Sequence, residues 1–441
     1  MLRRFWHVVV LTLLTAGATI ASANAQDALS AATTASPQLK PRSADYISDS
    51  GLAAEDLTRK MLANNLELQA ARQRLLQAEA RLQQAELRPN PSLEFQEKND
   101  RIISNHGSRE RELTFKQPLG LFGKRSRRIE VAQVEIERIR YEVADLERQR
   151  RAELGTLLGQ ALAEATRLYA LERITELNDS LRGATMVRVK AGDASRYEST
   201  QIEAEAVRLE TDRWRVASRL DSLMLQLKAL IGIDATEPFL LRAPALEPAD
   251  EPIRLDEALR LALESRPDLK AARLAEEEAA AKIKLAETGS TSDVGVILGF
   301  KRPSTVDPAP VHSSDWQFKV GVSITLPVFN RNQGLIRESV AALNEARLHR
   351  ESLEQFIRRD VMIAVKRLDQ AQRDLKLYQD RALRLTRSSV QMAKLGFEQG
   401  ELRLVDYIAE QRRLADLEDA YAQAGNELFQ ARVELKRALG Q

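Results

Sequence analysis

The stretch SSDWQFKVGVSITLPVF, residues 313–329, decides the fold, because its pattern differs from that of the sequence around it. Apolar side chains occupy every second position, and polar or small residues such as Lys319, Ser323 and Thr325 lie between them. This period of two predicts a β-strand with one apolar and one polar face. The apolar positions are Trp316, Phe318, Val320, Val322, Ile324 and Leu326.

The rest of the chain has the pattern of long helices. Only 5% of the 441 residues are aromatic, and Ala, Leu, Glu and Arg are frequent, as in coiled coils. No proline interrupts residues 123–190 or 334–395, so each segment predicts a helix on the order of 90–100 Å long. Apolar residues recur in steps of four and three, which predicts helices packed side by side. These runs extend from Ile129 to Leu146, from Ile357 to Leu385 and from Leu414 to Ala438.

The chain also contains an internal repeat. At a spacing of 201 residues Leu68 recurs as Leu269, and at a spacing of 209 residues Pro118 recurs as Pro327. Around Gly192 the spacing is 208 residues. So long a period indicates a duplicated structural half, read as helix, two strands, a very long helix, a turn and another long helix.

This repeat sets the expected domain boundaries. We expect a signal peptide at residues 1–25, an N-terminal extension at 26–55, a first repeat at 56–240, a linker at 241–255 and a second repeat at 256–440. The expected strands are residues about 91–98 and 109–118 in the first repeat, and about 293–301 and 315–327 in the second.

The N-terminus has the features of an export signal. Arg3 and Arg4 precede an apolar stretch from Val8 to Ile20, and Ala23-Asn24-Ala25 fits the small-x-small cleavage rule. That stretch is shorter than the ~20 residues of a membrane-spanning helix, which disfavours the alternative of an uncleaved anchor. We therefore expect export and cleavage before Gln26.

Composition excludes several function classes. Of 66 Lys and Arg residues, two are lost with residues 1–25, which leaves 64 against 64 acids and no basic field for nucleic acid. The absence of cysteine excludes disulfides, thiolate metal sites and a lipidated N-terminus. The segment GLFGKR (120–125) lacks phosphate-loop spacing, and His106, His312 and His349 are not at ligand spacing. We expect no enzyme activity, no cofactor and no metal site.

Four strands cannot cross a membrane alone, because their open edges would leave backbone groups unpaired in hydrocarbon. Bacterial outer-membrane barrels need at least eight strands, so four per chain require an oligomer, and three copies would supply twelve. The apolar residues of the opening stretch would then face lipid, and Lys319, Ser323 and Thr325 a water-filled lumen. The alternative is a small amphipathic sheet packed on helices.

Three segments carry a resemblance to a known family: RPNPSLEF (88–95), QPLGLFGKRSRRIEVAQ (117–133) and GVSITLPVFNRNQG (321–334). They resemble the signature segments of TolC-like outer-membrane efflux proteins, and most of all their CzcC-type heavy-metal branch. The resemblance implies a homotrimer with a twelve-stranded β-barrel and a twelve-helix tunnel. It also implies docking to a periplasmic adaptor (membrane fusion) protein and an inner-membrane RND pump. Some relatives carry a lipidated N-terminal cysteine, which this chain lacks.

The resemblance places a periplasmic tip at two equivalent turns, KAGDASRYES (190–199) and EQGELRLVDY (398–407). A glycine interrupts the helical run in each turn, and an acid that favours a helix N-terminus follows it. The residues expected to dock the adaptor are Gly192, Asp193, Gly400 and Glu401, and those expected to form a tip gate are Arg188, Arg196, Glu198, Arg403 and Asp406. A purely structural role is the alternative.

A second set lies where the strands meet the long helices. Its basic residues fit either an electrostatic ring around the lumen or ordinary anchoring at the membrane interface. The set comprises Pro118, Gly123, Lys124, Arg125, Pro327, Arg331 and Gly334.

The sequence thus predicts a passive outer-membrane exit duct of a tripartite RND-type efflux system for heavy-metal cations, in contact with outer-membrane lipid and extending into the periplasm. A drug-efflux or type I secretion channel of the same architecture is one alternative. A periplasmic coiled-coil structural protein is the alternative from another class.

Overall fold

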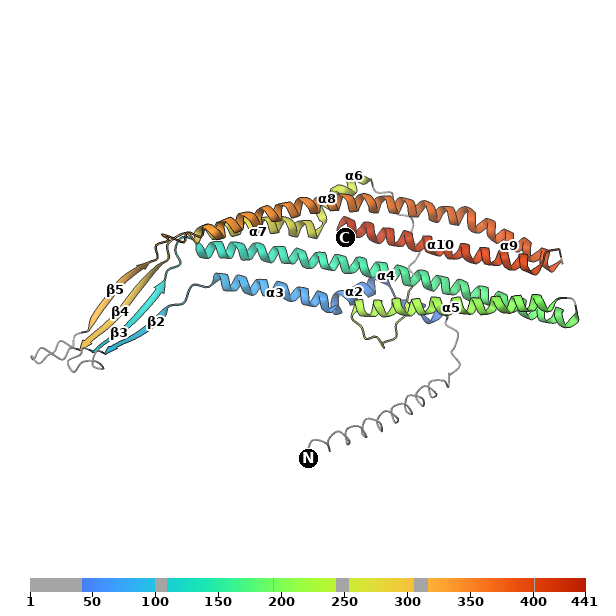
Figure 1. Ribbon diagram of the computed structural model, residues 1–441, viewed down its shortest axis with the longest axis horizontal. Coiled ribbons are helices and arrows are strands. Elements are labelled where there is room, and N and C mark those ends of the chain that lie inside the picture. Colours follow the sequence, from blue (N-terminus) through green and yellow to red (C-terminus); the bar gives the residue numbers. More distant parts are fainter. Residues whose placement is uncertain (1–41, 100–108, 193, 243–253, 305–315, 400) are drawn as a thin grey trace, which may run out of the picture.

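The computed structural model describes residues 42–99, 109–192, 194–242, 254–304, 316–399 and 401–441. Long helices lie alongside one another, and a four-stranded sheet extends beyond their ends at one extremity of the molecule (Figure 1). The expected signal peptide, most of the N-terminal extension and of the linker, Asp193, Gly400, His106 and His312 lie outside the described residues.

The two halves of the chain follow the same order of elements, except that the first begins with an additional 3₁₀-helix and strand and the long helix of the second is divided in two. The first half comprises η1 (Ser43–Asp45), β1 (Ile47–Leu52), α2 (Ala54–Asn64), α3 (Leu66–Glu86), β2 (Ser92–Asn99), β3 (Arg109–Pro118), α4 (Lys124–Ala191) and α5 (Arg196–Ile231). The second half comprises α6 (Leu255–Ser265), α7 (Pro267–Thr288), β4 (Val294–Ser304), β5 (Gln317–Ile324), α8 (Gln333–Leu377), α9 (Leu383–Glu398) and α10 (Leu404–Leu439). The predicted fold class, mainly helical with long helices and a small sheet, is confirmed. With 68 residues, α4 alone is about 100 Å long.

Local sequence signals set the ends of these helices. The side chain of Asn65 caps α3 by accepting two backbone N–H bonds at 3.0 Å. Pro267 begins α7, where its missing N–H and fixed φ suit the first helical position. Gly192, Gly232 and Gly440 end α4, α5 and α10 with φ values of 86°, 72° and 90°, which glycine adopts without strain.

The sheet is antiparallel throughout, with strand order β2-β3-β4-β5. Leu93 lies opposite Phe115, Phe115 opposite Leu298, and Leu298 opposite Val320. Because directly opposed residues share a face, this row runs across one side of all four strands. The two halves of the chain meet between β3 and β4, and β2 and β5 are left as the edges of the described sheet.

The helices pack through apolar side chains along their seams. The central helix α4 contacts α3, α5, α7 and α10. Around its middle Leu158, Leu168, Leu220 and Leu227 are at most 2% exposed. Burial of each such side chain stabilises the fold by about 1.5–3 kcal/mol, which charged outer faces cannot supply. None of the described helices combines the length and apolar character needed to cross a membrane.

The heptad run predicted from Ile357 to Leu385 is wrong at its end. Ile357 and Ala371 lie on a buried stripe, but Leu385 is 66% exposed whereas Leu383 is 6% exposed. A π-helical turn, Tyr378–Ala382, separates α8 from α9. Such a turn adds one residue to a helix. The buried stripe therefore continues at Leu383, one position after Ala382, where the heptad spacing predicted it.

A segment near the N-terminus is tied to the middle of the α4–α5 pair. The N–H of Leu241, which follows α5, donates to Tyr46 O at 2.8 Å. A Cβ at Gly51 would lie 2.5 Å from Leu241 O, so no other residue fits there without a backbone shift. The Tyr46 hydroxyl donates to Asp221 on α5 at 2.8 Å, and burial together with this bond raises the pKa of Tyr46.

Candidate functional site

One side of the sheet is an exposed apolar surface. Phe318 is 61% exposed and Val320 is 64% exposed. The described helices stop where the sheet begins (Figure 1), so a sheet packed on helices does not describe the molecule. Contiguous apolar surface of this kind marks contact with a partner or a membrane. This surface, the apolar sheet face, comprises Leu93, Phe95, Leu113, Phe115, Val296, Leu298, Phe300, Trp316, Phe318, Val320, Val322, Ile324 and Leu326.

Aromatic and basic side chains end the apolar sheet face on the side away from the helices. The rings of Phe300 and Phe318 have centroids 5.2 Å apart. The guanidinium of Arg302 lies 5.6 Å from the ring centroid of Trp316. Aromatic side chains flanked by Arg are typical of the interface between a bilayer and water.

The opposite side of the sheet is polar, and its charges are paired between strands. The Nζ of Lys319 on β5 lies 3.1 Å from the carboxylate of Glu112 on β3. Gly299, on the intervening β4, places no side chain between them. Two further pairs, Lys116–Glu94 and Lys301–Glu110, join neighbouring strands. A face of this kind suits water rather than hydrocarbon.

The first junction between sheet and helices depends on three predicted residues. Gly123 precedes α4 with φ 75°, a conformation that side chains disfavour. The Nζ of Lys124 donates to Thr291 O at 3.1 Å, and the Nε of Arg125 donates to Glu86 O at 2.7 Å. These two cations therefore hold the ends of α7 and α3, where unpaired carbonyls and the helix dipole favour positive charge.

The second junction is organised by a residue that the sequence prediction omitted. Asn332 precedes α8 with φ 57°, and its Nδ2 donates to Ala286 O at 3.1 Å. Its position in the fold is that of Gly123 in the first half. The predicted residues Arg331 and Gly334 are exposed on either side of it.

The two predicted prolines lie at the ends of strands. Pro118 is the last residue of β3, and Pro327 lies three residues beyond Ile324, the last residue of β5. Both lie where the chain leaves the sheet for a long helix.

The first predicted tip turn joins α4 to α5. Gly192 ends α4, and Ser195 Oγ accepts the backbone N–H of Glu198 at 3.2 Å, which caps α5. Arg196 is the first residue of α5 and is exposed.

The second predicted tip turn joins α9 to α10. The Glu401 N–H donates to Gly396 O at 2.8 Å. Arg403 precedes α10, and its Nε lies 3.1 Å from an oxygen of Asp406 within the same first turn. This pair is exposed to solvent, so it contributes little to the stability of the start of α10.

An apolar cluster holds the two tip turns against each other. The guanidinium of Arg188 lies 5.4 Å from the ring centroid of Phe397, and this ring stacks on Tyr407 at 5.8 Å. The buried members of the cluster come from four helices and are Leu181, Ile202, Ala393, Leu404, Tyr407 and Ile408. The α4–α5 and α9–α10 hairpins therefore meet at their ends.

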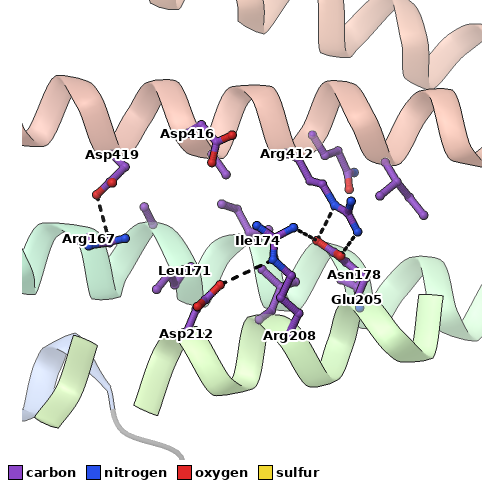
Figure 2. A pocket seen from close by; sticks show the side chains of 15 residues that line it. Arg167, Leu171, Ile174, Asn178, Glu205, Arg208, Asp212, Arg412, Asp416 and Asp419 are labelled. Atoms are coloured by element: carbon purple, nitrogen blue, oxygen red, sulfur yellow. Dashed lines mark hydrogen bonds and ion pairs between the residues drawn. The ribbon is translucent and has the colours of Figure 1, made fainter. Parts of the chain in front are cut away.

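An ion pair that the sequence prediction missed joins the same two hairpins further from the tip. Both carboxylate oxygens of Glu205 on α5 accept hydrogen bonds from Arg412 on α10, one of them at 3.0 Å (Figure 2). Glu205 is 6% exposed, and Arg208 Nη1 lies 3.9 Å from it. In the sequence Glu205 stands between Ile202 and Leu209 at core heptad spacing, and a charge at such a position was the available signal.

A cavity of about 260 Å³ lies beside this pair, between α4, α5 and α10. On its wall Arg167 of α4 pairs with Asp419 of α10 at 3.0 Å (Figure 2). Asn178 and Gln411 line it at 2% and 8% exposure, and the side-chain amide nitrogen of each has no partner among the described residues. Water has room to reach these amides, so the hairpins are packed less tightly here than at the apolar cluster.

Two carboxylates, one buried and one half-buried, lie where α7 packs against α4. Burial opposes ionisation of Glu278, but hydrogen bonds from Lys282 and Arg138 outweigh it and hold the pKa of Glu278 below its usual value. Burial also opposes ionisation of Asp268, but the hydrogen bond and charge of Arg266, the charge of Arg148 and the backbone N–H of Leu269 together outweigh it and lower the pKa of Asp268. Both groups are therefore charged at neutral pH and serve as structural ion pairs.

The described parts of the chain contain no group of three or more His, Cys, Asp or Glu side chains that could hold a metal ion. The features that they bring together are surfaces: an apolar and a polar sheet face at one extremity, and two joined helical hairpins at the other.

Comparison with known proteins agrees with this arrangement. The family model described as outer membrane efflux protein matches residues 258–441. The chain is 26% identical over 386 residues to the cobalt-zinc-cadmium resistance protein CzcC of Cupriavidus metallidurans, and this alignment covers 86% of this chain and 87% of that protein. It is 27% identical over 320 residues to the nickel and cobalt resistance protein CnrC of the same organism, with 69% and 70% coverage.

Solved structures share the fold. The outer-membrane channel OprN superposes with a TM-score of 0.72 at 19% identity, over 92% of this chain and 97% of that one. CusC, whose structures concern folding and transmembrane channel formation, superposes with a TM-score of 0.73 at 16% identity, over 92% of this chain and 95% of that one. The open state of the Neisseria gonorrhoeae MtrE outer membrane channel superposes with a TM-score of 0.70 at 18% identity, over 92% of this chain and 93% of that one.

Proposed function

The chain belongs to the TolC-like outer membrane efflux protein family, whose members are channels and not enzymes, and from this premise we propose that it is the exit duct of a tripartite RND-type system that exports heavy-metal cations. The duct is passive, and the partner pump supplies the energy. Channels of this family form trimers, and three copies of the four-stranded sheet supply the twelve strands of a closed barrel.

The observation that carries the membrane assignment is the apolar sheet face. Its exposed side chains, such as Phe318 and Val320, face lipid in the proposed barrel. The polar side, with Lys319, Ser323 and Thr325, lines a water-filled lumen. Pairing of Lys319 with Glu112 reduces the net charge of that wall, so the barrel admits ions without binding them tightly.

The metal assignment rests on the names of the relatives, which are resistance proteins for cobalt, zinc, cadmium and nickel. Export through a cleaved signal peptide and residence in the outer membrane belong to the same proposal. A drug-efflux or secretion channel of the same architecture is the alternative.

The helical end is the proposed docking point for the periplasmic adaptor. The two tip turns, with Gly192, Asp193, Gly400 and Glu401, offer it two similar surfaces. The proposed gate combines the predicted Arg188, Arg196, Glu198, Arg403 and Asp406 with the Glu205–Arg412 pair. Because that pair links the two hairpins of one chain, the hairpins separate only when it breaks.

A deletion strain tests the substrate class. The strain should become sensitive to one or more of zinc, cobalt, cadmium, nickel and copper, and a plasmid copy of the gene should restore resistance. Sensitivity to drugs alone would favour the alternative substrate.

Purified protein should run as an SDS-resistant trimer that dissociates on heating and should conduct in planar bilayers. Recovery as a soluble periplasmic monomer would refute the membrane assignment.

A further inference from the structure

We infer that β5 of one chain pairs with β2 of the next in one defined register, in which Thr325 lies opposite Gln96 of the partner subunit. The inference rests on the proposed trimeric duct and specifies the surface through which its subunits join. Both strands are edges of the described sheet, so their outer N–H and C=O groups have no strand beside them.

The first step is that the two hairpins of the chain are equivalent residue by residue. Adding 201 to each β2 number and 209 to each β3 number, the spacings of the internal repeat, converts the first hairpin into the second. Phe95 opposite Leu113 becomes Val296 opposite Val322, and the structure contains both pairs. The same conversion reproduces the other residue pairs along these strands. The spacings come from the sequence and the pairings from the structure, so two separate observations agree.

The second step uses the junction between β3 and β4, where the first half of a chain meets the second. In a closed ring the second half meets the first half of the next chain, and the equivalence of the two hairpins predicts that it does so in the same way. The conversion turns β3 into β5 and β4 into β2 of the partner subunit. Lys116 opposite Ile297 then becomes Thr325 opposite Gln96 of the partner subunit.

The faces of the two edges agree with this register. Leu326 falls opposite the partner subunit's Phe95, and both belong to the apolar sheet face. Ser323 falls opposite the partner subunit's Lys98 on the polar side. A register shifted by one residue would place polar against apolar side chains along the whole edge.

The end of β5 supplies an independent indication. β3 continues to Pro118, but β5 stops at Ile324, three residues before the equivalent Pro327. β3 has a neighbour on each side, whereas β5 has one. In the inferred register the partner subunit supplies opposite residues for Thr325, Leu326 and Pro327, so the second neighbour completes the strand.

The pairing geometry makes Thr325 suitable for a disulfide test. The Leu119 N–H donates to Val294 O at 2.9 Å, so this pair is hydrogen-bonded and every second pair along β3–β4 is not. The pair at Lys116 is therefore not hydrogen-bonded, and neither is its equivalent, Thr325 with the partner subunit's Gln96. Cα atoms of such pairs lie about 4.5 Å apart, within the range that a disulfide spans.

The experiment uses the natural absence of cysteine. Thr325→Cys with Gln96→Cys tests the inferred register, and Thr325→Cys with Lys98→Cys or Glu94→Cys tests registers shifted by two residues either way. The matched control is Lys116→Cys with Ile297→Cys, the equivalent pair within one chain. Ser323→Cys with Lys98→Cys is a second pair in the inferred register and decides the outcome if the first double variant does not assemble.

After oxidation of the full-length protein in membranes, the Thr325/Gln96 pair should give a covalent trimer on heated, non-reducing SDS gels. Its yield should approach that of the intrachain control and exceed that of either shifted pair roughly tenfold. Cross-linking of a shifted pair alone overturns the register and leaves the trimer intact. SDS-resistant trimers without any intersubunit cross-link overturn pairing between β5 and β2. A monomer in native mass spectrometry refutes the proposed trimeric duct itself.

Discussion

The ion pair between Glu205 and Arg412 predicts that its two partners are not equally costly to remove. The Glu205 side chain is 7% exposed, whereas the Arg412 side chain is 48% exposed. Arg412→Ala leaves a buried carboxylate with Arg208 as a more distant partner at 3.9 Å. Leaving a buried charge without its partner lowers stability by about 3–5 kcal/mol. For Arg412→Ala we expect a loss of about 3 kcal/mol, because Arg208 compensates in part.

Removal of the acid should cost less. In Glu205→Gln the side chain keeps its shape and one acceptor oxygen, and Arg412 can turn toward water. The loss is then about 1.5 kcal/mol, the lower end of the range for hydrogen bonds to charged groups, because Arg412 is half-exposed. Since 1.4 kcal/mol is a factor of ten, local opening should increase about 100-fold in Arg412→Ala and about tenfold in Glu205→Gln.

Amide hydrogen exchange at the start of α5 and of α10 measures this opening, because exchange under native conditions reports local separation of the hairpins. Arg413→Ala is the matched control, since the Arg413 side chain is 74% exposed and its Glu410 partner lies 3.8 Å away on the same helix. Its effect should stay below about 0.5 kcal/mol. The double variant Glu205→Gln/Arg412→Ala should be less destabilised than Arg412→Ala alone, because it contains no unpaired buried carboxylate. Equal effects of Arg412→Ala and Arg413→Ala, or a larger effect of Glu205→Gln, would refute the reasoning.

Three other predictions concern the rest of the molecule. Gly51→Ala should lower the melting temperature measured by circular dichroism, because its Cβ would lie 2.5 Å from backbone atoms of the neighbouring segment, whereas Gly183→Ala, with no atom within 4 Å, should stabilise α4 by about 0.5–1 kcal/mol. The pKa of Asp268 is lowered in the folded state, so its contribution to stability is present above the unfolded pKa of about 3.9 and lost as pH falls through the folded value. Asp268→Asn should therefore lower the free energy of unfolding at pH 7 and flatten its decline below pH 4, and an unchanged acid limb would contradict this. Val320→Arg on the apolar sheet face should cost about 2–4 kcal/mol in a bilayer and reduce heat-modifiable trimer, whereas Ser323→Glu on the polar side, opposite the partner subunit's Lys98 in the inferred register, should assemble normally.

The sequence predicted the sheet well because a strand's faces are encoded in its own alternation. The side chains from Trp316 to Leu326 needed no partner to reveal a period of two. The spacings of the repeat even contained the strand register, because Phe95 and Leu113 recur as the paired Val296 and Val322.

Features that depend on contacts between distant helices were harder to predict. The π-helical turn at Tyr378–Ala382 contains no Pro or Gly, and the heptad spacing continues through it to Leu385, so the local sequence does not indicate where the buried stripe resumes. Glu205 and Arg412 are far apart in the sequence and lie on different hairpins, and each by itself resembles an ordinary solvated charge. Asn332 takes the left-handed position that Gly123 holds in the other half; the preference of Asn for this conformation and the repeat spacing of 209 residues were the available signals.

The π-helical turn also limits the symmetry that the proposed trimeric duct can have. At the sheet the two hairpins of each chain are equivalent, so a trimer approximates six-fold symmetry there. The turn is present in the helix of the second half, whereas its counterpart α4 is one unbroken α-helix of 68 residues. From the level of that turn to the tip the proposed trimer would therefore retain three-fold symmetry only. A ring of six identical partner molecules at the tip would meet two alternating environments, and its members would bind with two different affinities.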